Sequence, residues 1–379
     1  TTDETGSATI KNLPLGNYKV VEKTAPDGFV HNGTEQNVQY VYVDQNTPVV
    51  VESVEFINER QKVEISVEKQ DAENGSTIAG AEFGLYAKED IKAGEKVIVK
   101  ADEQLCTAVT GDDGTAVFEQ DLPFGSYYIK ELQAPDGFVS SDEIIEVTVS
   151  YQGQDVEVVR LKEIFKNQPT TVEFTKSDLT TGVELDGATL TVLDKDGDEI
   201  DKWTSVKGEP HIIKRLHVGE TYTLREEFAP YGYLKAEEVE FTITDTAEIQ
   251  KVEMKDDVPI GRIIINKKGE FLSEVSWNDM VAGAMDSIWG YVTGSLKDVT
   301  FEIYAREDVK AADGESDDYY KKDELVATIT TDELGFARSD DLPLGKYYVV
   351  EKETANGFVL GGEPRDCLLY TSPSPRDRT

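Results

Sequence analysis

Short stretches in which apolar and polar residues alternate recur along the chain, and glycine-containing turns such as Asp-Gly and Asn-Gly separate them. Clear examples are residues 63–67, 83–86, 144–149 and 241–243. Successive side chains of a strand point to opposite faces, so this alternation indicates strands with one buried face. The pattern predicts an all-β protein made of β-sandwiches.

One stretch departs from this alternation. The apolar residues Trp277, Met280, Ala284, Ile288 and Tyr291 recur at the spacing of a helix. We therefore expect a short helix or an apolar flap over residues 276–292, inserted into the last domain of the chain.

A longer motif occurs four times. It reads Leu-Pro-x-Gly-x-Tyr, then a glutamate, then Ala-Pro-x-Gly-Phe, with a weaker third copy beginning at Leu216. The glutamates of the copies lie roughly 95 to 125 residues apart, which is the size of an ordinary β-sandwich domain; they are Glu22, Glu131, Glu226 and Glu351. Four copies of the motif predict four tandem prealbumin-like, or reverse immunoglobulin-type, sandwiches.

The domain boundaries follow from these repeats and from the prolines Pro169 and Pro259. No long Ser/Gly linker separates the units, so neighbouring domains are expected to be held stiffly end to end in an elongated rod. We expect the C-terminal part of a truncated domain over residues 1–60, complete domains over 61–168 and 169–258, and a C-terminally truncated domain over 259–366.

The last residues, 367–379, are unlike anything before them. They form a polar, basic ending on an acidic chain and resemble an in-frame translation of a sequencing adapter. The alternative is a natural Ser/Pro tail. We expect a non-native tail that packs against nothing, and it is left out of the fold prediction.

Polar residues in each domain lie an even number of positions from the apolar residues of their strand, and are therefore expected on the same, buried face. The repeat glutamate follows the apolar residues of its strand in this way. A lysine follows those of the opening strand, and an amide or carboxyl residue follows those of the closing strand. A strand end with a snorkelling lysine would explain one such case. Recurrence at matching parity instead favours a shared buried site, with members Lys69, Glu131 and Asn167 in one domain and Lys176, Glu226 and Asp256 in the next.

A lysine, a glutamate and an asparagine or aspartate that meet in an apolar core are able to react with one another. Burial lowers the pKa of a lysine towards the neutral, nucleophilic amine and raises the pKa of a glutamate. The glutamate then polarises the carbonyl group and carries the proton while ammonia leaves from Asn or water from Asp. The predicted product is an intramolecular isopeptide bond.

The repeats and the segments at residues 67–71 and 78–83 resemble the B-type, prealbumin-like domains of Gram-positive collagen adhesins and pilins. The third domain resembles the streptococcal fibronectin-binding-protein domain that was split into a tag and catcher pair and that joins Lys to Asp. The resemblance implies that Glu131 and Glu226 are the catalysts. It also implies that Lys69 is joined to Asn167, and Lys176 to Asp256.

The outer domains hold only parts of this site. The first has Glu22 and Asn58 without a lysine strand, and the last has Lys267 and Glu351 without a closing strand. We expect neither partial triad to close a bond within this chain.

The charge of the chain excludes one class of function. The 75 Asp and Glu residues against 38 Lys and Arg residues give a net charge of -37, which repels nucleic acid. No apolar run is long enough for a membrane span, and no leader opens the sequence. A fraction of 39% hydrophobic residues nevertheless indicates a folded chain.

No metal site or cofactor is expected. The carboxylates of residues 194–199 alternate as in a calcium loop, but Asp196-Gly197 is better explained as a hairpin turn. His31, His211 and His217 form no ligand pair. Only two cysteines occur, too few for a disulfide framework, and Cys106 is expected to be a buried thiol.

These features predict a structural stalk of a Gram-positive cell-surface adhesin or pilin, stabilised by self-made isopeptide bonds, and not an enzyme that turns over a substrate. The expected location is extracellular, at the cell wall. Host matrix or surface ligands, neighbouring pilins and peptidoglycan would be contacted through regions outside this fragment. The alternatives are an accessory module array of a surface hydrolase and a module that binds matrix protein or glycan directly.

Overall fold

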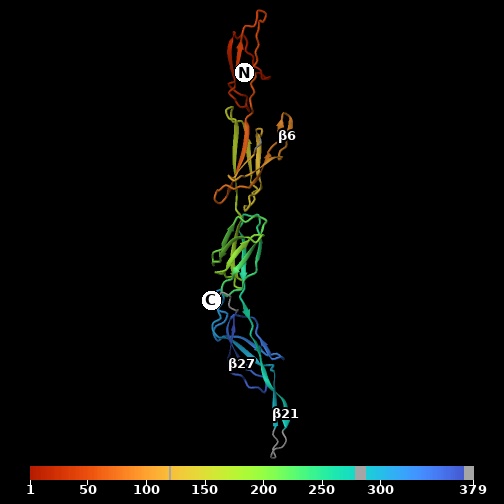
Figure 1. Ribbon diagram of the computed structural model, residues 1–379, viewed down its shortest axis with the longest axis vertical. Coiled ribbons are helices and arrows are strands. Elements are labelled where there is room, and N and C mark those ends of the chain that lie inside the picture. The colour runs from red at the N-terminus through yellow and green to blue at the C-terminus, as the bar shows by residue number, and fades with distance from the viewer. Residues whose placement is uncertain (119–120, 278–286, 371–379) are drawn as a thin grey trace, which may run out of the picture. The chain divides into compact units, whose positions relative to one another are not determined.

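The computed structural model describes residues 1–118, 121–277 and 287–370 of the chain, and the regular structure in that part consists of strands without a helix (Figure 1). The all-β prediction is confirmed. The chain divides into two compact units, which we describe separately. The first holds Thr1–Thr171, Lys214–Gly219 and Ile243–Ile249, and the second holds the remainder.

The first unit begins with one antiparallel pair of strands, β1 (Gly16–Val21) and β2 (Glu35–Tyr40). A β-sandwich of two sheets follows. One sheet has the order β10-β9-β4-β7, and the other has the order β11-β3-β8. Their bounds are β3 Lys62–Asp71, β4 Glu82–Ala87, β7 Gln104–Val109, β8 Thr115–Phe118, β9 Gly125–Gln133, β10 Ile144–Val149 and β11 Val158–Asn167.

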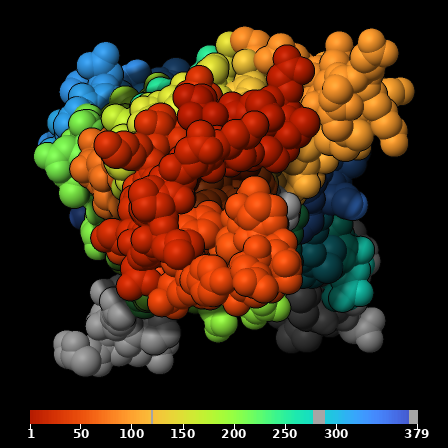
Figure 2. Space-filling model, turned by 90° about the horizontal axis from the view of Figure 1, so that it is seen from above, coloured from red at the N-terminus to blue at the C-terminus, as the bar shows by residue number. Residues whose placement is uncertain are grey.

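The core of this sandwich lies between the two sheets. Fully buried apolar residues on strands of both sheets, among them Ile65, Phe83, Tyr127 and Phe165, pack together in one cluster. A hairpin of β5 (Ile91–Ala93) and β6 (Lys96–Val99) projects from the side of the sandwich, and it is visible in orange in Figures 1 and 2. Alternating burial along β3 follows from its sequence, because every second side chain faces the core.

The second unit contains another two-sheet sandwich with the orders β15-β12-β18 and β14-β13-β16-β17. In this sandwich, as in the first unit, the opening and closing strands are direct neighbours in parallel register. The register pairs β12 with β18 here and β3 with β11 in the first unit. The bounds are β12 Thr171–Asp178, β13 Thr189–Leu193, β14 Glu199–Thr204, β15 His211–Lys214, β16 Thr221–Phe228, β17 Val239–Thr242 and β18 Gln250–Asp256.

The second sandwich has a core of its own, with buried residues such as Phe174, Leu190 and Leu224. The rest of the second unit is built around a four-stranded sheet with the order β24-β23-β27-β28, which covers a third apolar core. Short pairs, β19 with β26 and β20 with β25, and a long hairpin, β21 with β22, complete it. The bounds are β19 Ile260–Gly261, β20 Ile264–Asn266, β21 Lys268–Trp277, β22 Ser287–Ser295, β23 Thr300–Ala305, β24 Leu325–Thr330, β25 Phe336–Arg338, β26 Leu342–Pro343, β27 Gly345–Glu353 and β28 Arg365–Leu369.

No helix occurs in the described part of residues 276–292. The two ends of this segment belong to strands β21 and β22, which pair antiparallel, while residues 278–286 lie outside the described part. The helical spacing was a wrong indication because apolar side chains of this strand pair, such as those of Leu272, Trp289 and Tyr291, are more than half exposed. No core imposes strict alternation at these positions.

The tail prediction also needs a correction. Cys367 and Leu369 are part of β28, which pairs with β27, and both side chains pack against the third core. The chain therefore continues its sheet through residue 369, two residues beyond the point where the tail was expected to begin. Residues 371–379 lie outside the described part.

The recurring motif has a physical explanation in each close copy. The tyrosine hydroxyl donates a hydrogen bond to the carbonyl of the motif proline four residues earlier, with O···O distances of 2.7, 2.6 and 2.8 Å from Tyr18, Tyr127 and Tyr347. This bond closes the Leu-Pro-x-Gly loop over the start of the strand that contains the glutamate or, in the first copy, ends directly before it. The motif therefore fixes where that strand begins and which face its side chains take.

Candidate functional site

The first unit brings Lys69, Glu131 and Asn167 together inside the sandwich. Lys69 lies on β3, Glu131 on β9 and Asn167 on β11, so the site joins both sheets. Lys69 Nζ is 2.7 Å from Glu131 Oε1, and the two side chains are 0% and 2% exposed. Lys69 Nζ also donates a short hydrogen bond to Asn167 Oδ1.

The third contact of this trio joins Asn167 to Glu131. Asn167 Nδ2 donates to both carboxylate oxygens of Glu131, each at 2.9 Å. The amide oxygen thus faces the lysine and the amide nitrogen faces the glutamate. A glutamate in this position is able to take a proton from the amine and deliver one to the amide nitrogen.

Two features of the surroundings of Lys69 have opposite effects on the charge of its amino group. Burial lowers the pKa of Lys69, although the neighbouring Glu131 acts in the opposite direction by favouring the ammonium. The rings of Phe83 and Phe165 lie 5.5 and 5.8 Å from Nζ and also favour the ammonium. The balance brings the neutral, nucleophilic amine within easier reach than for an exposed lysine.

The sandwich of the second unit holds the corresponding trio of Lys176, Glu226 and Asp256, on β12, β16 and β18. Lys176 Nζ contacts Asp256 Oδ1 and lies 3.0 Å from Glu226 Oε1, and all three side chains are at most 1% exposed. Leu190 and Met254 lie beside Glu226 and Lys176 in the strand register, in the places that Phe83 and Phe165 hold in the first unit.

Burial affects the protonation of Asp256 in this second trio. Desolvation raises the pKa of Asp256 to about 6, Lys176 opposes this rise, and the neighbouring Glu226 adds to it. Within the described part of the chain, Asp256 Oδ2 is buried without a hydrogen-bond partner, and Glu226 Oε1 has Lys176 Nζ nearby without an aligned hydrogen bond. A proton on Asp256 would give this carboxyl a donor of its own.

The two partial triads are also assembled as pairs. Asn58 Nδ2 donates to Glu22 Oε1 at 2.8 Å, and Lys267 Nζ lies 2.8 Å from Glu351 Oε2. One carboxylate oxygen of each glutamate, Glu22 Oε2 and Glu351 Oε1, is buried without a partner in the described residues. Lys267 is more exposed than the other lysines, at 26% of its side chain.

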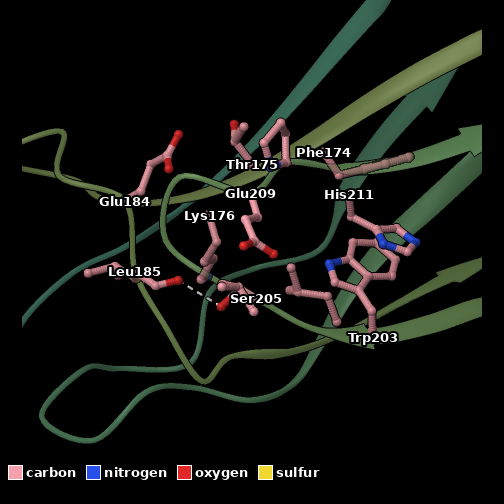
Figure 3. Close-up of a pocket in the computed structure, with 12 residues that line it drawn as sticks. Phe174, Thr175, Lys176, Glu184, Leu185, Trp203, Ser205, Glu209 and His211 are labelled. Carbon is pink, nitrogen blue, oxygen red and sulfur yellow. Dashed lines mark hydrogen bonds between the residues drawn. The ribbon is translucent and has the colours of Figure 1, made fainter.

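A small cavity of about 10 Å³ borders the Lys176 strand and has room for about one water molecule. Its lining includes Lys176, Ser205 and the stacked rings of Trp203 and His211, whose centroids are 4.1 Å apart (Figure 3). Ser205 Oγ donates to the carbonyl of Leu185 at its edge. The cavity is too small for an organic ligand.

Sequence reasoning missed one set of contacts at the glutamates. In three copies a backbone N–H ten residues after the glutamate donates to its Oε2, and the donors are Ser141, Ala236 and Gly361. A backbone donor leaves no mark in residue type. The constant spacing between the glutamate and the Gly-Phe turn was the signal that could have indicated it.

The remaining candidates form no site in the described residues. No group of three His, Cys, Asp or Glu side chains there could hold a metal ion. Asp194 Oδ1 accepts the backbone N–H groups of Asp196 and Asp198 and so closes the predicted turn. Burial raises the pKa of the free thiols of Cys106 and Cys367.

Comparison with known proteins identifies the domains. The family model SpaA, a prealbumin-like fold domain, matches residues 1–55, 63–163, 170–258 and 291–367. The chain belongs to this family. It is a tandem array of prealbumin-like domains, as the repeats predicted, and such domains are structural and not enzymatic.

Several solved structures are similar to the chain. The Bacillus anthracis TIE protein is 22% identical over 89% of this chain and 52% of its own, with a TM-score of 0.48, so the chain spans about half of that protein. The major pilin subunit BcpA of Bacillus cereus is 16% identical over 82% of this chain and 96% of its own, with a TM-score of 0.38. The shaft pilin SpaA of Lactobacillus rhamnosus GG is 16% identical over 52% and 98%, with a TM-score of 0.25. No curated protein matched.

The described residues include no helix with the length and apolar character needed to cross a membrane.

Proposed function

We propose that this chain is part of the stalk of a Gram-positive cell-surface protein, a pilin or an adhesin, whose domains lock themselves with intramolecular isopeptide bonds. The observation that carries the proposal is the buried contact of Lys69 with Glu131 and Asn167. Membership of the prealbumin-like family supports the structural role. Contacts with other pilins, the cell wall or host ligands would lie in other parts of the full protein.

In the first unit the reaction would join Lys69 to Asn167. Glu131 takes a proton from the ammonium, and the free amine attacks Cγ of Asn167. The bond from Cγ to Nδ2 breaks, Glu131 returns the proton to the leaving nitrogen, and ammonia departs. The surplus proton of the attacking nitrogen then passes to Glu131, which leaves a neutral amide.

In the second unit the bond would join Lys176 to Asp256. Here the amine attacks Cγ of the protonated Asp256 carboxyl, whose raised pKa of about 6 keeps the acid form accessible. The hydroxyl leaves as water after receiving a proton through Glu226. No outside reactant is needed in either domain, because the trio itself supplies the attacking amine, the acceptor carbonyl and the groups that transfer the protons.

The proposed bonds would resist mechanical extension. Each joins the opening and closing strands of a sandwich, which are already neighbours in the parallel register. A cross-link over 98 residues, as between Lys69 and Asn167, would stabilise the fold by roughly 4–5 kcal/mol if it acts as a disulfide of that loop length does. Tension would then pass through the linked strands without separating the sheets.

Peptide mapping of the full chain tests the proposal. The purified protein is denatured, digested and searched by mass spectrometry for peptides joined through Lys69–Asn167 and Lys176–Asp256. We expect both joined peptides, loss of only the first in Glu131→Ala, and loss of only the second in Glu226→Ala. Free Lys69 and Lys176 peptides throughout the folded wild-type protein would refute the cross-linking mechanism.

A further inference from the structure

The backbone donors at the glutamates share one geometry. The donating residues lie in the irregular segment after the motif turn, ten residues beyond the glutamate that each contacts. The N···O distances to Oε2 are 2.9 Å for Ser141 and Glu131, 2.7 Å for Ala236 and Glu226, and 3.2 Å for Gly361 and Glu351.

In both complete trios the backbone N–H and the lysine contact different oxygens of the carboxylate. The backbone N–H contacts Oε2, while Oε1 lies 2.7 Å from Lys69 Nζ in the first unit and 3.0 Å from Lys176 Nζ in the second. An ionised carboxylate accepts such a bond strongly, and the bond fixes the rotation of the carboxylate about its terminal torsion. The N–H thus determines which oxygen meets the amine.

The partial triads lack this division between the oxygens. Glu22 Oε2 is buried without a partner, and among the described residues the side chain that contacts this carboxylate is that of Asn58 and not of a lysine. At Glu351 both Lys267 and Gly361 contact Oε2, which leaves Oε1 without a partner among the described residues. The separation of donor and amine onto two oxygens therefore accompanies the presence of a complete trio.

We propose that the backbone N–H of Ser141 is a positioning donor for the Lys69–Asn167 reaction, and that the N–H of Ala236 serves Glu226 in the same way. This inference rests on the proposed cross-linking function. The N–H holds Oε2 so that Oε1 receives the proton of the amine. Ser141 and Ala236 touch neither the amine nor the acceptor, and they act only through the glutamate.

The same bond acts on the proton-accepting form of the glutamate. A carboxylate accepts a hydrogen bond more strongly than a neutral group does, and the carboxylate is the form that can take a proton from Lys69. Without the N–H, the carboxylate would lose this contact and its fixed orientation, and the reaction would slow. The other charged groups that face this site are Lys69 itself, from β3, and Glu143, which also acts on Lys69.

A one-atom change isolates this donor. In the full chain, Ser141→Ala keeps the N–H, whereas lactic acid at position 141 replaces the same N–H by an ester oxygen and has the same side chain. Both chains are assembled in denaturant from ligated segments, so that neither trio has reacted, and are then refolded, quenched at intervals and mapped for the joined Lys69–Asn167 peptide. Hydrogen exchange of β9 and β10 checks the fold.

We expect Ser141→Ala to react at the wild-type rate. The lactic acid chain should react at least about tenfold more slowly, the usual effect of losing a hydrogen bond to a charged group. In a Glu131→Asp background, where the shorter side chain withdraws the carboxylate from the N–H, the lactic acid change should cause little further slowing, because the N–H acts only through the carboxylate. The Lys176–Asp256 bond of the same molecule should form at an unchanged rate and serves as the internal control.

Three outcomes would overturn the inference. They are equal rates in the Ser141→Ala and lactic acid chains, an equal slowing by lactic acid in the Glu131→Asp background, and failure of the lactic acid chain to fold, which would make the N–H a structural requirement alone. Ser141→Pro also lacks the N–H and contains only natural amino acids, so it repeats the comparison without the lactic acid substitution. Absence of the joined peptide from wild type would instead refute the proposed function.

Discussion

At the scale of single residues, the two trios differ in the group that the lysine would attack. Asn167 does not titrate, whereas Asp256 does, and its pKa is raised to about 6 by burial. The rings beside Lys69 are Phe83 and Phe165, while the corresponding positions around Lys176 are aliphatic. One chain therefore carries two versions of the same proposed reaction with different dependences on pH.

Relative to the Lys69–Asn167 reaction, the Lys176–Asp256 reaction should slow as pH rises through about 6. Above that pH Asp256 is ionised, and a carboxylate is a poor acceptor for an amine, so the ratio of the two rates should drop by up to about tenfold per pH unit. The amide of Asn167 has no such titration. A chain assembled in denaturant from ligated segments, so that neither trio has reacted, is refolded at several pH values, and mapping both joined peptides gives the two rates from one sample.

A constant ratio of the two rates through pH 6 would contradict this assignment, since only the Asp256 acceptor titrates there. Asp256→Asn offers a matched control. Its acceptor no longer titrates, so the fall of the ratio near pH 6 should disappear.

At the scale of the strands, the Lys69 site depends on how closely the neighbouring loop approaches β3. Gly114 has φ +75, and a Cβ atom there would lie 2.5 Å from Thr77 Cβ and 3.0 Å from the backbone N of Ile78. The carbonyl of Gly114 also accepts the N–H of Lys69 at 2.9 Å. This glycine lets the loop hold the end of the reactive strand.

Gly114→Ala should destabilise this sandwich by about 2–4 kcal/mol, because a left-handed backbone and a collision with backbone atoms add together. Gly75→Ala is the control, since Gly75 has φ +74 but open space around its Cβ position, and it should cost only about 1–2 kcal/mol. Hydrogen exchange of β3 and β8 in the Glu131→Ala background measures both without the cross-link. Equal effects of the two substitutions would show that the close approach is unimportant.

The sequence predicted much of the site because strands repeat every two residues. Parity alone placed Lys69 and Glu131 on core faces, and the structure brings them within 2.7 Å. The sequence pattern could not reveal the Ser141 donor, because that donor is a backbone group. It also predicted a helix over residues 276–292, although the described ends of that segment belong to two paired strands. In that hairpin exposed residues such as Trp289 and Tyr291 have no core that would impose alternation.

At the scale of the whole molecule, regular structure is unevenly distributed. Residues 41–59 contain no strand, and Tyr42, Val51 and Ile57 are at least 70% exposed. Limited proteolysis should therefore cut residues 41–57 first and leave a resistant core over residues 61–258, because open segments are cleaved before packed ones. Equal survival of residues 1–60 would show that the proposed domain boundaries are misplaced.

The intact mass of the purified, fully denatured chain tests the central claim most directly. Cross-linking at Lys69–Asn167 and Lys176–Asp256 predicts a mass below the sequence value by one ammonia and one water. The double variant Glu131→Ala and Glu226→Ala should have its full calculated mass. A wild-type chain at full mass after folding, with both trios buried as described, would contradict the account.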